Sequence, residues 1–291
     1  MDSINKRSYG QKLKAYKRSP LSLALFLLVL VSTILTIGIL LFLIGYIMIR
    51  GIPNIKPELF QWEYNTLNVS LMPALINTVI MTLISLLIAA PIGIFSAIYL
   101  VEYAKRGNRL VGIIRITAET LSGIPSIVYG LFGLLFFVTA LGWGMSLLAG
   151  ACTLAIMILP LVMRTAEEAL KAVPDSYREG SYGLGAGKLR TVFRIVLPSA
   201  MPGILAGVIL GIGRIVGESA ALIYTAGTVA EIPKGRDFLF DSTRTLSVHM
   251  YALTSEGLYV NQSYATAVIL LFIVVLINWF SGYIAKKLTK S

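Results

Sequence analysis

The sequence predicts an all-α integral membrane protein with six transmembrane helices. Of its 291 residues, 56% are hydrophobic and 13% are charged, whereas a soluble globular domain carries about 25% charged residues. The apolar residues form continuous runs, and most charges lie between those runs. Strands of a membrane barrel would instead alternate apolar and polar residues. The pattern therefore favours helices and excludes a water-soluble enzyme, a disordered chain and a nucleic-acid-binding domain.

Five uncharged runs are long enough to cross a bilayer, because a hydrocarbon core of about 30 Å needs roughly 20 apolar residues in a helix. They are Leu21–Ile49, Ser70–Val101, Thr120–Met163, Ile195–Gly213 and Gly257–Ala285. The third run is too long for one helix. We expect it to divide into two spans at Gly142–Gly144, where glycines permit a tight turn, and we expect Pro125 and Pro160 to kink their helices.

The basic residues predict the orientation. Lys and Arg concentrate in the N-terminal tail, in the loops after the second and fourth spans, and at the C-terminus, which places both termini in the cytoplasm. We divide the chain into a basic cytoplasmic tail (1–20), a first transmembrane helix (21–49), a membrane core (70–285) with a large inner loop (164–198), and a cytoplasmic C-terminal tail (286–291). One cysteine and one histidine exclude a disulfide framework and predict no metal site.

The large inner loop carries the most specific pattern. A short helix is predicted from Asp175, because Pro174 suits a helix start, and Gly183 and the glycines after it end the helix. An amphipathic stretch over 191–197 follows, and we expect Pro198 to break it before the fifth span. The pattern consists of a Glu, two small residues, a Gly and an Ile-x-Leu-Pro at fixed spacing, namely Glu179, Gly180, Ser181, Gly185, Ile195, Leu197 and Pro198.

This pattern resembles the EAA motif of ABC importer permeases. Gly180 and Ser181 stand where that motif has two alanines. The resemblance implies the MetI-like permease fold with a cytoplasmic coupling helix, and it implies a separate ATPase that contacts the matched residues. The chain itself would then be a transport subunit and not an enzyme. It would bind no cofactor, and its ATPase partner would use ATP and Mg²⁺.

Two further stretches, Glu119–Gly133 and Gly211–Ala226, resemble the inorganic phosphate permeases, and more closely the PstA-type subunit. That resemblance implies import of phosphate across the plasma (inner) membrane of a prokaryote. It also implies the partners of such importers: a homologous PstC-type permease, two PstB-type ATPases that engage the Asp175–Gly185 region, and an extracytoplasmic PstS-type binding protein. No nucleic acid is expected among the partners.

Charged residues inside the bilayer are candidate substrate-path residues, because they are costly to bury. Arg214 and Glu218 are four residues apart and would share one helix face. We expect Arg214 to line the anion path and Glu218 to pair with it when the path is empty; the alternative is a structural ion pair. For Arg164 and Glu167 we expect either an ion pair at the inner mouth of the path or an exposed ion pair at the membrane interface.

Other interpretations remain open at this stage. The motif also fits a permease for another oxyanion, such as molybdate or sulfate. A membrane-embedded enzyme and an ion-coupled secondary transporter are rivals from other classes, but they give no reason for the inner-loop motif. Gly203, Gly207 and Gly211 form a small-residue stripe that permits close helix packing, within the chain or against another subunit.

Overall fold

The computed structural model describes residues 20–105, 107–255 and 257–289, and every regular element in these ranges is helical. The chain divides into two compact units, Met1–Arg50 and Gly51–Ser291. Of the predicted tails, residues 1–19 and 290–291 lie outside the described residues. The all-α prediction is confirmed for the described part of the chain.

The first unit contains α2 (Pro20–Gly51), which runs on into the first residue of the second unit. It matches the predicted first span to within two residues at either end. Its 32 residues extend about 48 Å at 1.5 Å per residue. Apolar residues occupy every side of this helix, as in a span that faces lipid.

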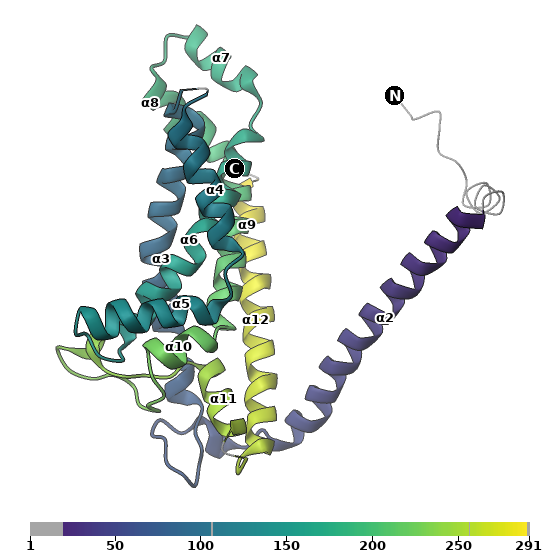
Figure 1. Cartoon of the computed structure of the whole chain (residues 1–291), viewed down its shortest axis with the longest axis vertical. Coiled ribbons are helices and arrows are strands. Elements are labelled where there is room, and N and C mark those ends of the chain that lie inside the picture. The colour runs from purple at the N-terminus through teal and green to yellow at the C-terminus, as the bar shows by residue number, and fades with distance from the viewer. Residues whose placement is uncertain (1–19, 106, 256, 290–291) are drawn as a thin grey trace. The chain divides into compact units, whose positions relative to one another are not determined.

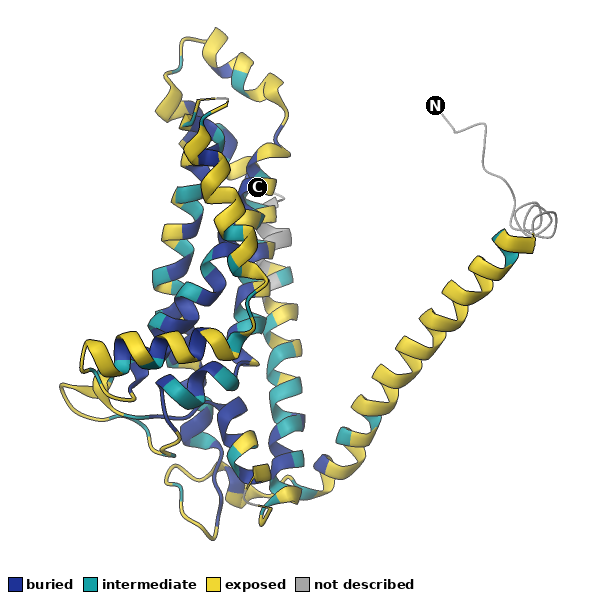
Figure 2. Ribbon diagram, in the orientation of Figure 1, coloured by how far each residue is buried: buried dark blue, intermediate teal, exposed yellow. Residues whose placement is uncertain are grey.

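The second unit is a helical bundle with α6 at its centre (Figure 1). Its long helices are α3 (Met72–Ile98), which continues as the π-helix η3 (Tyr99–Tyr103), α6 (Leu147–Lys171), α9 (Leu197–Val216) and α12 (Val260–Thr289). Figure 2 shows the buried residues gathered along α6 and on the facing sides of its neighbours. Counting α2, five described helices are long and apolar enough to cross a membrane.

The predicted glycine stripe lies against α6. A Cβ added at Gly203 would come 2.6 Å from the Cβ of Ala169, and one added at Gly207 would come 2.6 Å from the Cβ of Thr165. No side chain larger than hydrogen fits at these two contacts without a shift. The stripe is therefore a packing seam within the chain, the first of the two expectations.

The third predicted span is not a straight helix. It is replaced by α4 (Arg109–Ser122) and by α5 (Ser126–Gly133), which continues as the π-helix η4 (Leu134–Ala140). The two parts meet at an angle of 102°. Pro125 lies at the bend, where it has no N–H to continue the helix. The Tyr129 hydroxyl donates a 2.7 Å hydrogen bond to the Leu121 carbonyl across this bend, in addition to the 3.1 Å hydrogen bond that this carbonyl accepts from the Ile124 N–H.

The other two expectations for this region have different outcomes. The chain turns between η4 and α6 as predicted, with positive φ angles of 68° at Gly142 and 66° at Gly144. At Pro160, α6 continues as one helix, and the expected kink there stays a prediction. The predicted division of the long apolar run at Gly142–Gly144 is therefore confirmed. The first of the two parts also bends sharply at Pro125.

Short elements complete the end of the bundle opposite the large inner loop. They are η1 (Ile52–Asn54), η2 (Pro57–Phe60), α10 (Ala220–Thr225), η6 (Phe238–Phe240) and α11 (Leu246–Ser255). A Cβ at Gly130 would lie 2.7 Å from the Cα of Ala221. This close approach packs α5 directly against α10, so two short helices meet inside the bundle.

Candidate functional site

The inner loop forms the helix that its sequence predicts. The helix α7 (Asp175–Gly183) follows Pro174, which occupies the N-cap position. Gly185 has φ +82°, a left-handed conformation that glycine adopts at little cost. The Gly185 N–H donates to the Tyr182 carbonyl at 2.9 Å, which closes the end of the helix. The glycines therefore end the helix as expected.

The return to the membrane differs from the expectation. The short helix α8 (Lys188–Thr191) continues through the π-helix η5 (Val192–Val196) into α9, and the whole run from Lys188 to Val216 is helical. Pro198 therefore does not break the helix. It lies inside this continuous run, directly after the π-helix η5, where its missing N–H omits one backbone hydrogen bond without ending the helix.

The motif residues divide into buried and exposed groups. The Ser181 hydroxyl lies 2.8 Å from the Thr191 hydroxyl, and both side chains are buried, so they join α7 to α8. Ile195 and Leu197 are half-buried beside the core, whereas Pro198 is exposed. Glu179, Gly180 and Gly185 are exposed on the loop surface.

The sequence interpretation missed the apolar side chains around the exposed motif residues. Tyr177, Tyr182 and Leu184 lie on or beside α7 with large exposed fractions, 91% for Leu184. Exposed apolar groups in the most polar loop of a membrane protein are typical of a protein-binding surface. Their presence among charged residues was the signal available in the sequence. We call Tyr177, Glu179, Tyr182 and Leu184 the α7 surface.

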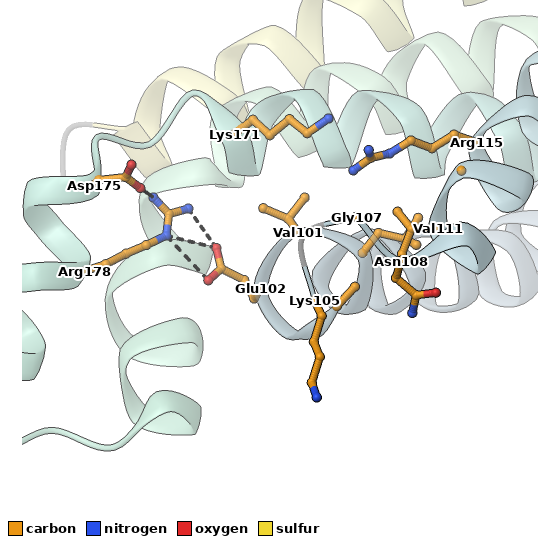
Figure 3. A pocket seen from close by; sticks show the side chains of 13 residues that line it. Val101, Glu102, Lys105, Gly107, Asn108, Val111, Arg115, Lys171, Asp175 and Arg178 are labelled. Atoms are coloured by element: carbon orange, nitrogen blue, oxygen red, sulfur yellow. Dashed lines mark hydrogen bonds and ion pairs between the residues drawn. The ribbon is translucent and has the colours of Figure 1, made fainter.

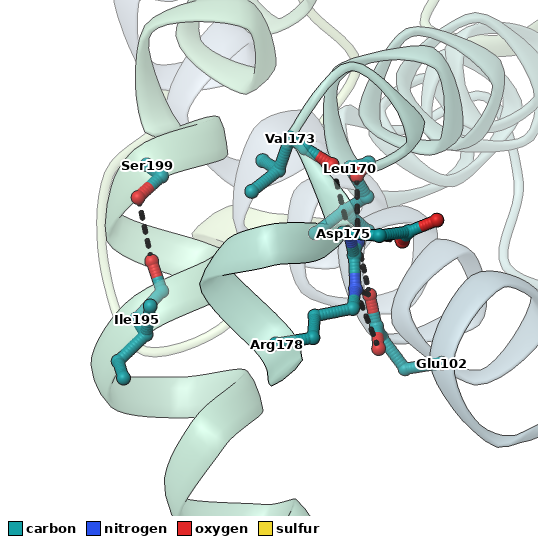
Figure 4. A network of polar contacts seen from close by, with 7 residues as sticks. All are labelled: Glu102, Leu170, Val173, Asp175, Arg178, Ile195 and Ser199. Atoms are coloured by element: carbon teal, nitrogen blue, oxygen red, sulfur yellow. Dashed lines mark hydrogen bonds and ion pairs between the residues drawn. The ribbon is translucent and has the colours of Figure 1, made fainter. Parts of the chain in front are cut away.

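A buried ion pair joins α7 to the end of α3. Arg178 Nη2 donates to Glu102 Oε1 at 2.7 Å, and Arg178 Nε donates to the same oxygen at 3.1 Å. The Arg178 side chain is 15% exposed and that of Glu102 4%. Figure 4 shows the guanidinium between Glu102, Asp175 and the carbonyls of Leu170 and Val173.

This arrangement uses the donor capacity of Arg178 almost completely. The hydrogen bond to Glu102 raises the pKa of Arg178 above its ordinary value, so the side chain stays charged. The bound carbonyls belong to the last turn of α6 and the residues just after it, so one side chain contacts the ends of α3 and α6 together. Glu102 lies on the π-helix η3, and π-turns often occur at functional positions. Neither residue was among the predicted site residues.

A cavity of about 700 Å³ lies beside this ion pair. Figure 3 shows Arg115, Lys171 and Arg178 around it, together with Lys105 at its rim. The cavity is bounded by the chain after η3, by α4, and by the ends of α6 and α7. Its cationic lining is consistent with the basic side of a membrane protein.

Arg164 and Glu167 do not form the predicted pair. Glu167 Oε1 lies 2.7 Å from Arg115 Nη2 and 2.6 Å from Lys171 Nζ, and the Glu167 side chain is only 7% exposed. Arg164 instead contacts Glu119 at 3.8 Å and Glu168 at 3.4 Å. Both residues therefore link α6 to α4, in two adjacent ion-pair groups at one end of the bundle. They line the same small cavity.

Arg214 and Glu218 also do not pair, because the helix ends between them. The last residue of α9 is Val216, and Gly217 caps it. Buried Glu218 accepts a 3.1 Å hydrogen bond from the Ala221 N–H at the start of α10. Arg214 is half-buried, and within the described residues it forms no ion pair.

Comparison with known proteins identifies the family. A family model described as "Binding-protein-dependent transport system inner membrane component" matches residues 89–290. The chain belongs to this family. As a binding-protein-dependent transport component, it is a multi-pass inner-membrane transport subunit.

Curated relatives extend this assignment. The chain is 32% identical over 271 residues to "Probable ABC transporter permease protein YqgI" of Bacillus subtilis, covering 87% of this chain and 92% of that protein. It is 36% identical over 218 residues to "Phosphate transport system permease protein PstA 2" of Mycobacterium bovis, covering 72% and 71%. These matches confirm the resemblance to PstA-type permeases that the sequence analysis gave.

Solved transporters share the fold. The alginate ABC transporter in complex with its alginate-bound periplasmic protein matches with a TM-score of 0.69 at 16% identity, covering 95% of this chain and 98% of that chain. The inward-facing MetNI methionine ABC transporter matches with a TM-score of 0.59 at 19% identity, covering 75% and 94%. The MetI-like permease fold predicted for this transport component is confirmed.

Proposed function

We propose that the chain is the PstA-type permease subunit of an ATP-driven importer that moves inorganic phosphate into the cytoplasm. The observation that carries the proposal is the match to the mycobacterial PstA 2 protein, at 36% identity over 72% of this chain. The region that the family model matches, residues 89–290, contains both the inner-loop motif and Arg214. Permeases for molybdate or sulfate share the motif, whereas the mycobacterial relative is named a phosphate transport permease.

The proposed importer has four kinds of subunit. This chain pairs with a homologous PstC-type permease, and two PstB-type ATPases bind in the cytoplasm. A PstS-type binding protein delivers phosphate on the opposite side. Both termini of the chain and the α7 surface then face the cytoplasm, which agrees with the basic residues near α7. ATP and Mg²⁺ bind to the ATPases and not to this chain.

The coupling step rests on the contacts of α7. The α7 surface offers Glu179 and exposed apolar side chains to an ATPase. Movement of α7 is passed to α3 through the Arg178–Glu102 ion pair and to α9 through the Ser181–Thr191 contact. The helices α3 and α9 thus each receive the movement through a buried contact near their cytoplasmic ends.

Arg214 is the proposed anion contact in the path. The Arg214 guanidinium is cationic, and its planar donor arrangement fits the oxygens of phosphate. The absence of a carboxylate partner among the described residues leaves that charge available to a substrate. Glu218 acts differently from our expectation: its carboxylate holds the start of α10, and so it positions the segment beside Arg214.

The test combines partner identification with transport. The tagged chain is purified from its native membrane, and co-purifying subunits are identified by mass spectrometry. The purified complex is then reconstituted, and ATP-dependent uptake of labelled phosphate is measured with excess unlabelled phosphate, sulfate or molybdate. We expect competition by phosphate alone. Competition by sulfate or molybdate alone would assign the permease to another oxyanion, and the absence of an ATPase would contradict the coupling mechanism.

A further inference from the structure

A buried arginine lies at the end of the bundle opposite α7. Arg244 precedes α11 and is only 5% exposed. Its backbone N–H donates to the Val229 carbonyl at 3.0 Å, and its carbonyl accepts a 3.4 Å hydrogen bond from Asn77 Nδ2 on α3. Two separate segments therefore hold the main chain at Arg244, and this fixes the backbone position from which the side chain extends.

The charge of Arg244 has no counter-charge within the described residues. No ion pair to Arg244 is present there, and its Nε and Nη2 are buried without a hydrogen-bond acceptor. Its guanidinium lies 4.5 Å above the centre of the Tyr64 ring. A cation–π contact offsets only part of the free energy lost when a guanidinium leaves water, because it provides no acceptor for the N–H groups.

The positions of the two unpartnered atoms are informative. Nε and Nη2 form one edge of the guanidinium, with their N–H bonds nearly parallel. This edge binds two oxygens of a carboxylate or phosphate side by side. The unpartnered edge therefore matches the geometry of an oxyanion.

Other unpartnered polar atoms surround Arg244. His249 on α11 is fully buried, and neither of its ring nitrogens has a partner among the described residues. Burial, with a smaller contribution from the charge of Arg244, lowers the pKa of His249 to about 3, so the ring is neutral and donates one N–H. The Thr243 hydroxyl and Asn77 Oδ1 are also unpartnered. The Tyr64 ring contacts both Arg244 and His249.

We propose that Arg244 anchors a binding site for one small inorganic oxyanion of the phosphate class, with the neutral His249 and the Thr243 hydroxyl as further donors. The proposal rests on the function proposed above and places a second anion contact on the side where the substrate enters. A cavity of about 250 Å³ has Tyr64 in its lining, whereas Arg244, Thr243 and His249 do not line it, so Tyr64 is the residue that connects the cavity to the site. Glu63, Glu231 and Lys234 line that cavity. Because these charges have both signs, the cavity does not favour anions, and Arg244 is the residue that would select an anion.

The experiment measures direct phosphate binding. The full chain is purified with its co-purifying subunits but without the binding protein, placed in lipid nanodiscs, and titrated with labelled inorganic phosphate in equilibrium dialysis. Arg244→Gln removes the charge, and Arg244→Lys keeps the charge but removes the parallel donor edge. Arg236→Gln is the matched control, because Arg236 is an exposed arginine in the same segment.

We expect Arg244→Gln to weaken phosphate binding roughly 10- to 100-fold, as for the loss of charge-assisted hydrogen bonds. Arg244→Lys should give an intermediate loss, and Arg236→Gln less than a twofold change. Unchanged affinity in Arg244→Gln, or an equal loss in the control, would overturn the proposal.

A second readout covers the case in which Arg244→Gln does not fold. Phosphate should raise the unfolding temperature of the wild-type protein and raise it less in Arg244→Lys; an equal rise in both would also overturn the site. The uptake experiment keeps the two proposals separate. If the complex takes up phosphate but phosphate binding does not depend on Arg244, only this inference is contradicted. If phosphate binding depends on Arg244 but the complex takes up no phosphate, only the proposed transport function is contradicted.

Discussion

Arg178 and Glu102 are 76 residues apart in the sequence, yet Arg178 Nη2 lies 2.7 Å from Glu102 Oε1 in a nearly water-free contact. The pair connects the inner-loop helix to the end of a membrane helix. A buried pair with several hydrogen bonds resists separation, because removing one partner leaves a buried charge without compensation. Movement of α7 is therefore expected to carry the end of α3 with it.

Glu102→Gln tests this connection. It should destabilise the protein by about 3 kcal/mol or more, as for loss of one partner of a buried pair, and it should lower phosphate uptake per ATP hydrolysed. Thermal unfolding and coupled uptake assays provide the measurements. Asp175→Asn is the control, because the Asp175 side chain is 78% exposed and its contact should contribute below about 1 kcal/mol. Equal effects of the two changes would argue against the connection.

Arg214→Gln should reduce phosphate uptake at least about tenfold, because a charge-assisted contact to the anion is lost. Arg214→Lys should retain part of the uptake, since it keeps the charge and loses the planar donor arrangement. Initial uptake rates in proteoliposomes distinguish the three proteins. Full uptake by both variants would remove Arg214 from the path.

Glu167→Gln should destabilise the inner end of the bundle by about 1–3 kcal/mol, because the buried carboxylate between Arg115 and Lys171 would be lost. Unfolding in denaturant measures the change. The neighbouring Glu168 has a side chain that is 67% exposed, and Glu168→Gln should change the stability by less than about 1 kcal/mol. A larger loss of stability in Glu168→Gln than in Glu167→Gln would show that the exposed carboxylate contributes more to stability than the buried one.

Gly207→Ala should destabilise the protein by about 1–3 kcal/mol through overpacking, because the new methyl group would meet Thr165 on α6. Gly213→Ala on the same helix is the control, since a Cβ there has no neighbour within 4 Å. Adding Thr165→Ala to Gly207→Ala should recover part of the loss. No recovery in the double variant would place the strain elsewhere.

The single histidine predicts a pH effect on stability. Because the pKa of His249 is lowered to about 3 in the folded state, while an unfolded histidine titrates near 6.5, the unfolded state binds a proton first as the pH falls. Stability should therefore decline below about pH 6.5, with a slope approaching about 1.4 kcal/mol per pH unit. Unfolding midpoints between pH 7 and 5 measure this decline. His249→Gln should flatten it, and an unchanged slope would contradict a buried neutral ring.

Local signals were sufficient for much of the fold. The apolar runs predicted the long helices, and Pro174, Asp175 and Gly185 predicted α7, because caps and glycines act within a few residues. These features depend on neighbours in the sequence, so the sequence alone contained them. The burial of Ser181 and the exposure of Glu179 were not predicted.

Contacts between distant segments were not predictable in this way. A helical repeat places Arg214 and Glu218 on one face only while the helix continues, and α9 ends at Gly217. Glu167 was matched to Arg164 by spacing, but it binds Arg115 from another helix. The Arg178–Glu102 pair and the open edge of Arg244 depend on tertiary packing, which no periodic pattern records.

The break at Pro125 has a consequence for how the bundle can deform. Since α4 and α5 are separate rods, the angle between them can change while each keeps its own backbone ladder. Tyr129 provides a side-chain tie across this bend through its hydrogen bond to the Leu121 carbonyl. A change in the angle between α4 and α5 would therefore stretch this hydrogen bond, whereas α6 continues as one helix from Leu147 to Lys171.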